Sequence, residues 1–397
     1  MERQANMKLN VRAVLVGITT AVCFPAHALA QDTVTEIVSF LVINRDIVTG
    51  DFERDRAAAE MARDTITRAL VVNLASVPIA TSSSGFLYRL NPQLGTVERA
   101  TDSFGGFFIE RALTPGHGRG SFGVSGSTTQ FERLDDQNLR DGTLLTTANQ
   151  FVDEAAPFDT ESLELRVRTS TLTAFASIGI GDRFEIGGAL PFVRLTLEGE
   201  RVNVYRGQSF VQARASAVAS GVADALVRAK YTLVSTRGGG VAVAGELRLP
   251  TGDEDNLLGA GTAGFRVIGI GAIERGPLML SGNTGIIRGG VSDEFTVGGA
   301  AAVAVHPRLS LTAEFLTRHV SELRPIELSS QPHPTIDGVQ TIRLIGGDPG
   351  RMVSGGITGF KWNPGGTFVV GANVRWSFTK AGLTAPITPS IAFEYGF

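Results

Sequence analysis

From about residue 118 to the end of the chain, apolar residues alternate with polar or small ones at a period of two. In the stretch 240–249, one set of alternate positions is apolar, while the other holds small or charged residues such as Glu246 and Arg248. Successive side chains of a β-strand point to opposite faces, so this period predicts strands with one apolar and one polar face. Twelve such strands are expected, at about 118–132, 162–180, 184–203, 222–235, 240–249, 262–274, 277–288, 294–305, 308–322, 351–362, 366–379 and 387–397.

The connections between these strands alternate between tight turns and longer polar loops. The tight turns are rich in glycine and proline, as in Gly181-Asp182-Arg183 and Asn363-Pro364-Gly365-Gly366. The longer loops are expected near 133–160, 205–219, 250–261, 289–293, 324–349 and 380–386. An even number of strands, with short connections at one end and long ones at the other, is typical of outer-membrane barrels.

The predicted fold is therefore all-β, a transmembrane antiparallel β-barrel of about twelve strands. Fourteen strands are the alternative, if residues 86–111 join the wall. A soluble β-sandwich also alternates, but soluble strands average only about five or six residues. Aromatic residues near the strand ends, such as Trp362 and Phe378, instead suit the interfacial girdles of a membrane barrel.

Two stretches depart from the alternation. Around Pro191 the pattern shifts its phase, which indicates a β-bulge or the end of a strand. In the strand 162–180 the pattern is lost after Thr173, so the pattern fixes no register there.

The first thirty residues are typical of a secretory signal peptide. Basic residues precede an apolar run from Val11 to Phe24, and Ala28-Leu29-Ala30 supplies the small residues of a cleavage site. A membrane anchor, the alternative, needs roughly 20 apolar residues, and this run has about 14. Cleavage after Ala30 would remove Cys23, the only cysteine, so the mature chain has no disulfide and no thiol-ligated metal.

Residues 32–75 show the spacing of a helix. Ile66, Leu70 and Leu74 form an apolar stripe with charged residues on the other faces. The earlier segment Val34–Ile43 fits either a short helix or a strand. Two roles stay open for this helical part: a plug that buries its stripe against the lumen wall, or a periplasmic helix that binds a partner or another protomer.

The chain is thus divided into three parts. The signal peptide covers residues 1–30, an N-terminal helical, plug-like segment covers 31–117, and the barrel covers 118–397. The second part includes a short hairpin, expected at Phe86–Leu90 and Thr96–Ala100 around Asn91-Pro92. Strand parity places both ends of the mature chain on the side of the short turns, which is the periplasmic side.

Charge limits the possible partners. The net charge is −3, and loss of three basic and one acidic residue with the signal peptide makes it −5. A nucleic-acid partner would require a basic surface, so none is expected. The expected partners are the lipid bilayer of the outer membrane and a small-molecule solute.

Several charged residues fall within the predicted strands. A charge on the lipid face costs roughly 2–4 kcal/mol at the membrane midplane, so these side chains are expected to point into the lumen. Two interpretations stay open and can coexist: mutually neutralising pairs that fill a narrow lumen, or a selective lining of a pore. The residues are Arg228, Lys230, Glu246, Arg248, Arg266, Glu314, Arg318, Arg375 and Glu394.

No catalytic, metal or cofactor site is expected. His319 and Ser321 lie two residues apart on one strand, which places them poorly for a nucleophile and its base. The acidic stretch from Pro250 to Asn256 offers oxygen ligands, but it lacks the spacing of a calcium-binding hand, so a solvated loop is expected. The protein is therefore not expected to be an enzyme.

The last strand carries apolar residues at alternate positions and ends on phenylalanine. These positions are Ile387, Pro389, Ile391, Phe393, Tyr395 and Phe397. This pattern resembles the C-terminal signal of outer-membrane barrels. The resemblance implies that Phe393, Tyr395 and Phe397 are read by the barrel-assembly machinery.

A broader resemblance covers about residues 160–397. It is carried by three stretches: Val222-Ala223-Asp224 to Lys230-Tyr231, then Glu246 to Asp253, then Leu258-Gly259-Ala260-Gly261. Together they resemble the barrel transporter family associated with meta-pathway phenol degradation. The resemblance implies passive passage of small, often aromatic or apolar molecules through the outer membrane. The helical N-terminal part is more similar to the hatch of long-chain fatty-acid transporters. A structural or adhesive barrel without an open pore is the alternative function.

Overall fold

The computed structural model describes residues 32–42, 52–75, 88–91, 96–99, 102–236 and 238–397. The predicted signal peptide lies outside these residues. Among the described residues, two helices, α2 (Val34–Val42) and α3 (Phe52–Ala75), precede a chain built almost entirely of antiparallel strands. The segment that fitted either a helix or a strand is therefore helical. Within the described residues, neither helix combines the length and apolarity needed to cross a membrane.

Twelve strands close into a barrel, as predicted. Each is hydrogen-bonded antiparallel to its two neighbours, and β8 pairs with β7 to complete the ring. In ring order these are β7 (Asp159–Ile180), β3 (Gly120–Phe131), β21 (Ile387–Gly396), β19 (Phe368–Ser377), β18 (Arg351–Gly365), β15 (Leu309–Val320), β14 (Glu294–His306), β13 (Leu278–Gly289), β12 (Gly264–Arg275), β11 (Gly239–Leu249), β10 (Ala225–Thr236) and β8 (Phe184–Tyr205). The fourteen-strand alternative is wrong, because β1 (Tyr88–Asn91) and β2 (Thr96–Arg99) pair only with each other.

The apolar positions of the strands face outward. In β11, for example, Val241 and Leu247 are 47% and 41% exposed, whereas Ala242 and Ala244 are buried inside. A soluble protein would place its apolar face inward, so this arrangement defines a surface for contact with lipid. The side chains of Phe393, Tyr395 and Phe397 also lie on the outer surface.

Four of the predicted long loops are wrong, since they contain further strands. β7 and β8 run past the barrel, and their projecting parts pair with extra strands to form what we call the loop-end sheet. The added strands are β6 (Leu145–Phe151), β9 (Gln208–Val222), β16 (Ile326–Pro332) and β17 (Val339–Gly346). The smaller strands β4 (Arg133–Leu134), β5 (Gln137–Asn138) and β20 (Leu383–Thr384) form a separate three-stranded sheet. These segments are short or polar, so their pairing depends on distant strand edges more than on their own pattern.

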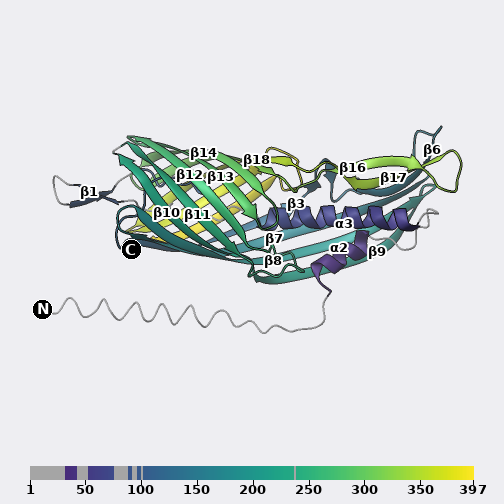
Figure 1. The fold of residues 1–397 in the computed structure, drawn as a ribbon, viewed down its shortest axis with the longest axis horizontal. Helices are drawn as coiled ribbons and strands as arrows, with labels where there is room; N and C mark the ends of the chain where they lie inside the picture. Colours follow the sequence, from purple (N-terminus) through teal and green to yellow (C-terminus); the bar gives the residue numbers. More distant parts are fainter. Residues whose placement is uncertain (1–31, 43–51, 76–87, 92–95, 100–101, 237) are drawn as a thin grey trace. The chain divides into compact units, whose positions relative to one another are not determined.

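Both helices pack at this end of the barrel, which we call the long-loop end. Figure 1 shows α2 and α3 beside the loop-end sheet and away from the C-terminus. The buried side chains Ile66 and Leu70 of α3 belong to the same apolar core as Leu163 and Leu195 of the wall strands. The first described residues therefore lie at the end opposite to Phe397, although strand parity predicted both ends on one side.

Helix α2 is held at both of its ends. Thr33 and Glu36 form a capping box, with the Glu36 amide donating to Thr33 Oγ1 at 3.2 Å and the Thr33 amide donating to Glu36 Oε2 at 2.7 Å. At the other end, Arg201 Nη1 donates to the carbonyl of Leu41 at 3.2 Å. Arg201 is itself buried and pairs with Glu161 at 2.8 Å, which fixes the guanidinium toward the helix C-terminus.

The irregularity predicted at Pro191 does not interrupt β8 itself. It occurs in the chain that lies opposite Pro191, between β9 and β10. β8 stays in register with β7 from Phe184 to Tyr205. On its other side, Phe192 pairs with Val222 and Ala189 with Leu226, so three residues face two. A proline has no amide hydrogen to donate, and the partner chain bulges opposite it. The pattern lost after Thr173 is likewise not a break, because β7 continues without a register shift.

Asp224, in that bulge, binds the loop that follows β11. Its carboxylate accepts hydrogen bonds from the amides of Gly252 at 3.1 Å and Ala260 at 2.8 Å. A Cβ atom at Gly259 would lie 2.5 Å from Asp224 Oδ1, so only glycine fits this approach. Residues from all three stretches of the family resemblance are therefore close together or bonded around Asp224. The loop after β11 also contacts the start of α2, because Thr35 Oγ1 donates to the carbonyl of Asp255.

Candidate functional site

An irregular stretch of chain, residues 102–115, lies inside the barrel. We call it the lumen segment. Its apolar side chains Phe104, Phe107 and Ile109 are buried, and it bonds to strands on several sides of the ring. Thr114 Oγ1 donates to the carbonyl of Asp182 at 2.9 Å, in the turn between β7 and β8. This stretch therefore reaches the end of the barrel with the tight turns, which we call the short-turn end.

Glu314 is the main anchor of the lumen segment. Its carboxylate accepts hydrogen bonds from three consecutive backbone amides, those of Phe107, Phe108 at 2.9 Å and Ile109 at 2.8 Å. Hydrogen bonds to an ionised acceptor are stronger than neutral ones. Next to it, Lys361 Nζ donates to the carbonyl of Gly106 and lies 4.6 Å from the centre of the Phe107 ring. One carboxylate and one ammonium thus hold a turn of backbone against β15 and β18.

A glycine of the wall makes room for the segment. A Cβ atom at Gly371 would lie 2.8 Å from the ring of Phe107. Because the lumen-facing position carries no side chain, the aromatic ring can lie directly against the backbone of β19. The segment is therefore fitted to the wall by shape as well as by hydrogen bonds.

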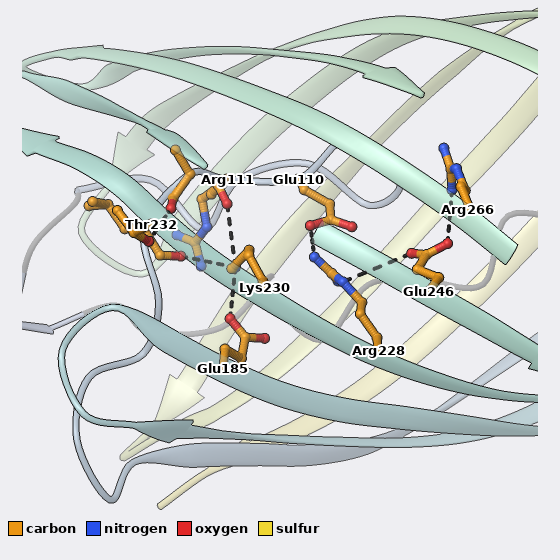
Figure 2. Close-up of polar contacts among 10 residues, drawn as sticks. Glu110, Arg111, Glu185, Arg228, Lys230, Thr232, Glu246 and Arg266 are labelled. Carbon is orange, nitrogen blue, oxygen red and sulfur yellow. Dashed lines mark hydrogen bonds and ion pairs between the residues drawn. The ribbon is translucent and has the colours of Figure 1, made fainter. Parts of the chain in front are cut away.

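Lys230 holds the next part of the lumen segment. It is fully buried and pairs with Glu185 at 2.7 Å, from the neighbouring strand β8. The same ammonium donates to the carbonyl of Leu113 at 3.1 Å, and Thr232 Oγ1 donates to the carbonyl of Ala112 at 2.7 Å. Figure 2 shows Lys230 between Glu185 and the segment. A buried ammonium needs such partners to offset its lost hydration.

A chain of charges continues across β10, β11 and β12 (Figure 2). Arg228 contacts Glu110 of the lumen segment and lies 3.9 Å from Glu246. Glu246 in turn pairs with Arg266 at 3.2 Å, and Arg266 donates to Thr296 Oγ1 at 3.3 Å. Acids and bases of adjacent strands therefore neutralise one another, as a mutually paired network would.

A cavity of about 220 Å³ lies within the lumen. Val72 of α3 lines it on one side, and Phe108 and Ile109 of the lumen segment line it on another. On this measure a single water needs about 10–15 Å³, so the space exceeds that of one water more than tenfold. The charged residues that line it are Glu185, Arg228, Lys230, Glu246, Arg248, Arg266, Glu294, Arg318 and Arg375.

The charged residues selected from the sequence have two different placements. Seven of the eight candidates line the cavity, namely Arg228, Lys230, Glu246, Arg248, Arg266, Arg318 and Arg375. Glu314 instead binds the lumen segment, and the additional residue Glu394 is buried in β21. Among the plug candidates, Ile66 and Leu70 are buried in the apolar core, and the side chain of Leu74 lies outside the described residues.

Sequence patterns did not reveal the lumen segment. It has neither helical nor strand periodicity, and its own charged residues Glu110 and Arg111 lie outside the predicted strands. A signal was present in Gly105-Gly106-Phe107-Phe108-Ile109, where two glycines precede an apolar run just before a charged pair. Such a run is costly in a solvated connector and fits a buried one.

These features define the class of the protein. A closed barrel of twelve antiparallel strands has an apolar exterior, a charged lumen, and connections that are tight at one end and long at the other. This is the architecture of an outer-membrane β-barrel. Within the part of the chain that is described, no group of three or more metal-ligating side chains gathers at one point.

Comparison with solved structures finds outer-membrane barrels. An outer-membrane channel from Pseudomonas putida F1 is 12% identical, with 72% of this chain and 98% of that chain covered and a TM-score of 0.45. The Ralstonia pickettii toluene transporter TbuX is 9% identical, with 82% and 99% covered and a TM-score of 0.31. Pseudomonas putida OprB is 11% identical, with 70% and 93% covered and a TM-score of 0.26. No protein-family model and no curated protein sequence matches the chain.

Proposed function

We propose that this protein is a passive outer-membrane channel for small molecules, aromatic and apolar ones among them. The observation that carries the proposal is the cavity inside the lumen, with apolar side chains and fixed charges in its wall. Binding sites for small molecules combine a largely apolar lining with a few convergent polar groups. A barrel filled only for structural reasons would not need such a space.

The chain itself forms the barriers at both ends of this cavity. The lumen segment lies between the cavity and the short-turn end, and α3 contributes Val72 on the long-loop side. Both are attached by side-chain packing and hydrogen bonds, which can break and reform. Helices α2 and α3 and the lumen segment thus act together as a plug, and passage requires the lumen segment to shift. The chain has no energy-coupling motif, so passage follows the solute gradient.

Export and assembly complete the proposal. Cleavage near Ala30 releases the mature chain, and the barrel-assembly machinery recognises the C-terminal strand. Phe393, Tyr395 and Phe397 support this role because they lie on the outer surface of β21. The ring of Phe122 on β3 lies 5.6 Å from Tyr395 and 6.4 Å from Phe397, at the contact between the first and last strands. The C-terminal signal on β21 therefore stays accessible to the assembly machinery until β21 pairs with β3 and closes the barrel.

Swelling of proteoliposomes tests the proposed passage. L-Phenylalanine is a suitable solute because it is small, aromatic and poorly permeant through lipid. Vesicles that contain the folded protein are expected to swell faster in isotonic L-phenylalanine than protein-free vesicles do. They should show no such excess in maltotriose, which is too bulky for the cavity. Equal rates with and without protein for both solutes would favour a structural barrel without an open pore.

A further inference from the structure

The cavity has an excess of positive charge, although the chain as a whole is acidic. Six cationic and three anionic side chains line it, an excess of three positive charges. Glu110 contacts Arg228 from outside the lining and reduces that excess to two. The net charge of the full chain is −3. The positive excess is therefore a local property of the lumen.

Most of these cations already have an anionic neighbour. Lys230 pairs with Glu185, Arg266 pairs with Glu246, and Arg318 lies 3.7 Å from Glu294. Arg228 contacts Glu110, and Arg248 is under the electrostatic influence of Asp224 and Glu246. These interactions use every carboxylate in the lining of the cavity.

Arg375 is different. Among the described residues no carboxylate forms an ion pair with it, and the charge that acts on it is the guanidinium of Arg318, a second cation. Its neighbours across the strands are Ile357 of β18 and Thr388 of β21, which also line the cavity. Arg375 is only partly buried, and a cation that lies beside another cation and an apolar side chain leaves a position that favours an anion. An incoming anion would occupy that position.

The rest of the lining determines what kind of anion fits. Aromatic and aliphatic side chains contribute to the wall, including Phe108, Phe131 and Phe175. A fully hydrated inorganic anion would gain little from these surfaces. A carboxylate matches the planar fork of a guanidinium with two parallel hydrogen bonds, and an attached apolar body would cover the rings.

We infer that the cavity is a binding site for small apolar carboxylates, with Arg375 as the residue that receives the carboxylate. The inference rests on the proposed channel function and names the substrate class of that channel. The apolar body of the ligand lies toward the aromatic side chains of the wall. Arg318, held toward Glu294, adds to the positive field without closing the site.

Calorimetric titration of the purified protein in detergent tests this inference. Benzoate and benzamide are the probes, since they have nearly the same shape and only benzoate is charged near neutral pH. The wild-type protein is expected to bind benzoate at least about tenfold more tightly than benzamide. Arg375→Gln should lose that preference while its benzamide affinity stays the same.

Arg166→Gln is the matched control, because Arg166 is 75% exposed at the side-chain level and does not line the cavity. It should bind both probes as the wild type does. Equal affinity of wild type for benzoate and benzamide, or an unchanged preference in Arg375→Gln, would overturn the inference. Absence of benzoate binding by the folded wild-type barrel would do so as well.

The binding measurement is independent of transport. If phenylalanine passes and benzoate has no advantage over benzamide, the channel stands and the carboxylate site fails. If benzoate selectivity is present and depends on Arg375, while no solute passes, the site stands and the channel fails. The two proposals can therefore be rejected separately.

Discussion

Replacing Glu314 with leucine is expected to make open-channel events in planar bilayers about 100-fold more frequent. The substitution removes the acceptor of three backbone hydrogen bonds from the lumen segment. Hydrogen bonds to a charged group contribute roughly 1.5–3 kcal/mol each. A net loss of about 3 kcal/mol, well below their sum, shifts the closed-to-open equilibrium by about two orders of magnitude.

A control carboxylate separates this effect from a general change in charge. Glu198 lies on the projecting part of β8, and its side chain is 56% exposed and faces Arg166 of β7. Glu198→Leu is expected to show the opening frequency of the wild type. If Glu314→Leu, confirmed as a folded barrel, opens no more often than the wild type, then these hydrogen bonds do not keep the lumen closed.

Replacing Lys230 with methionine is expected to lower the free energy of unfolding by about 3–5 kcal/mol. The change removes the buried ion pair between Lys230 and Glu185 and the hydrogen bonds from Lys230 to the lumen segment. Urea titration of the protein in lipid vesicles measures the loss. The double variant Lys230→Met/Glu185→Gln should recover part of the stability, because the negative charge of Glu185 is removed together with the positive charge of Lys230.

An exposed ion pair on the same barrel supplies the comparison. Arg214 and Glu200 are only 2.6 Å apart, but the side chain of Arg214 is 72% exposed. Solvent screens such a pair, so Arg214→Met is expected to change the free energy of unfolding by no more than about 1 kcal/mol. Losses of similar size for Lys230→Met and Arg214→Met would contradict the role assigned to burial.

The barrel was predictable because its strands contact lipid on one face and the lumen on the other. That environment imposes a local alternation, as in β11, and each strand carries enough of it to be recognised alone. The loop-end sheet was not predictable in this way. β17 pairs with β6, which is distant in the sequence, and β16 pairs with β17. The bulge expected at Pro191 was assigned to the wrong strand for a related reason. It lies in the neighbouring chain, which is distant from the pattern around Pro191.

The candidate site was predictable only in part. Charges within apolar strands were expected to face inward, and in the structure Arg228, Glu246 and Arg375 are among the residues that line the cavity. The pattern could not assign partners, because Glu110 and Glu185 lie far from their cations in the sequence. The lumen segment was missed since it is irregular, and irregular chain has no period to detect. The conformation of the lumen segment is determined by the surrounding barrel wall, including the space that Gly371 leaves for the ring of Phe107.

The lumen segment and the cavity depend on neighbouring parts of the same strands. Glu314 and Arg318 are four residues apart on β15, and both point inward. One holds the segment and the other lines the cavity. A ligand in the cavity would therefore lie next to the segment that we propose as the barrier.

The most direct test of the account is the single-channel conductance of a variant in which residues 104–112 are replaced by glycine and serine at the same length. We expect larger and longer conductance steps than the wild type shows, because in the wild type the chain itself closes the lumen. A second variant that lacks residues 32–75 measures the share of the helices. A correctly folded barrel that stays non-conducting after both changes would contradict a channel closed by its own chain.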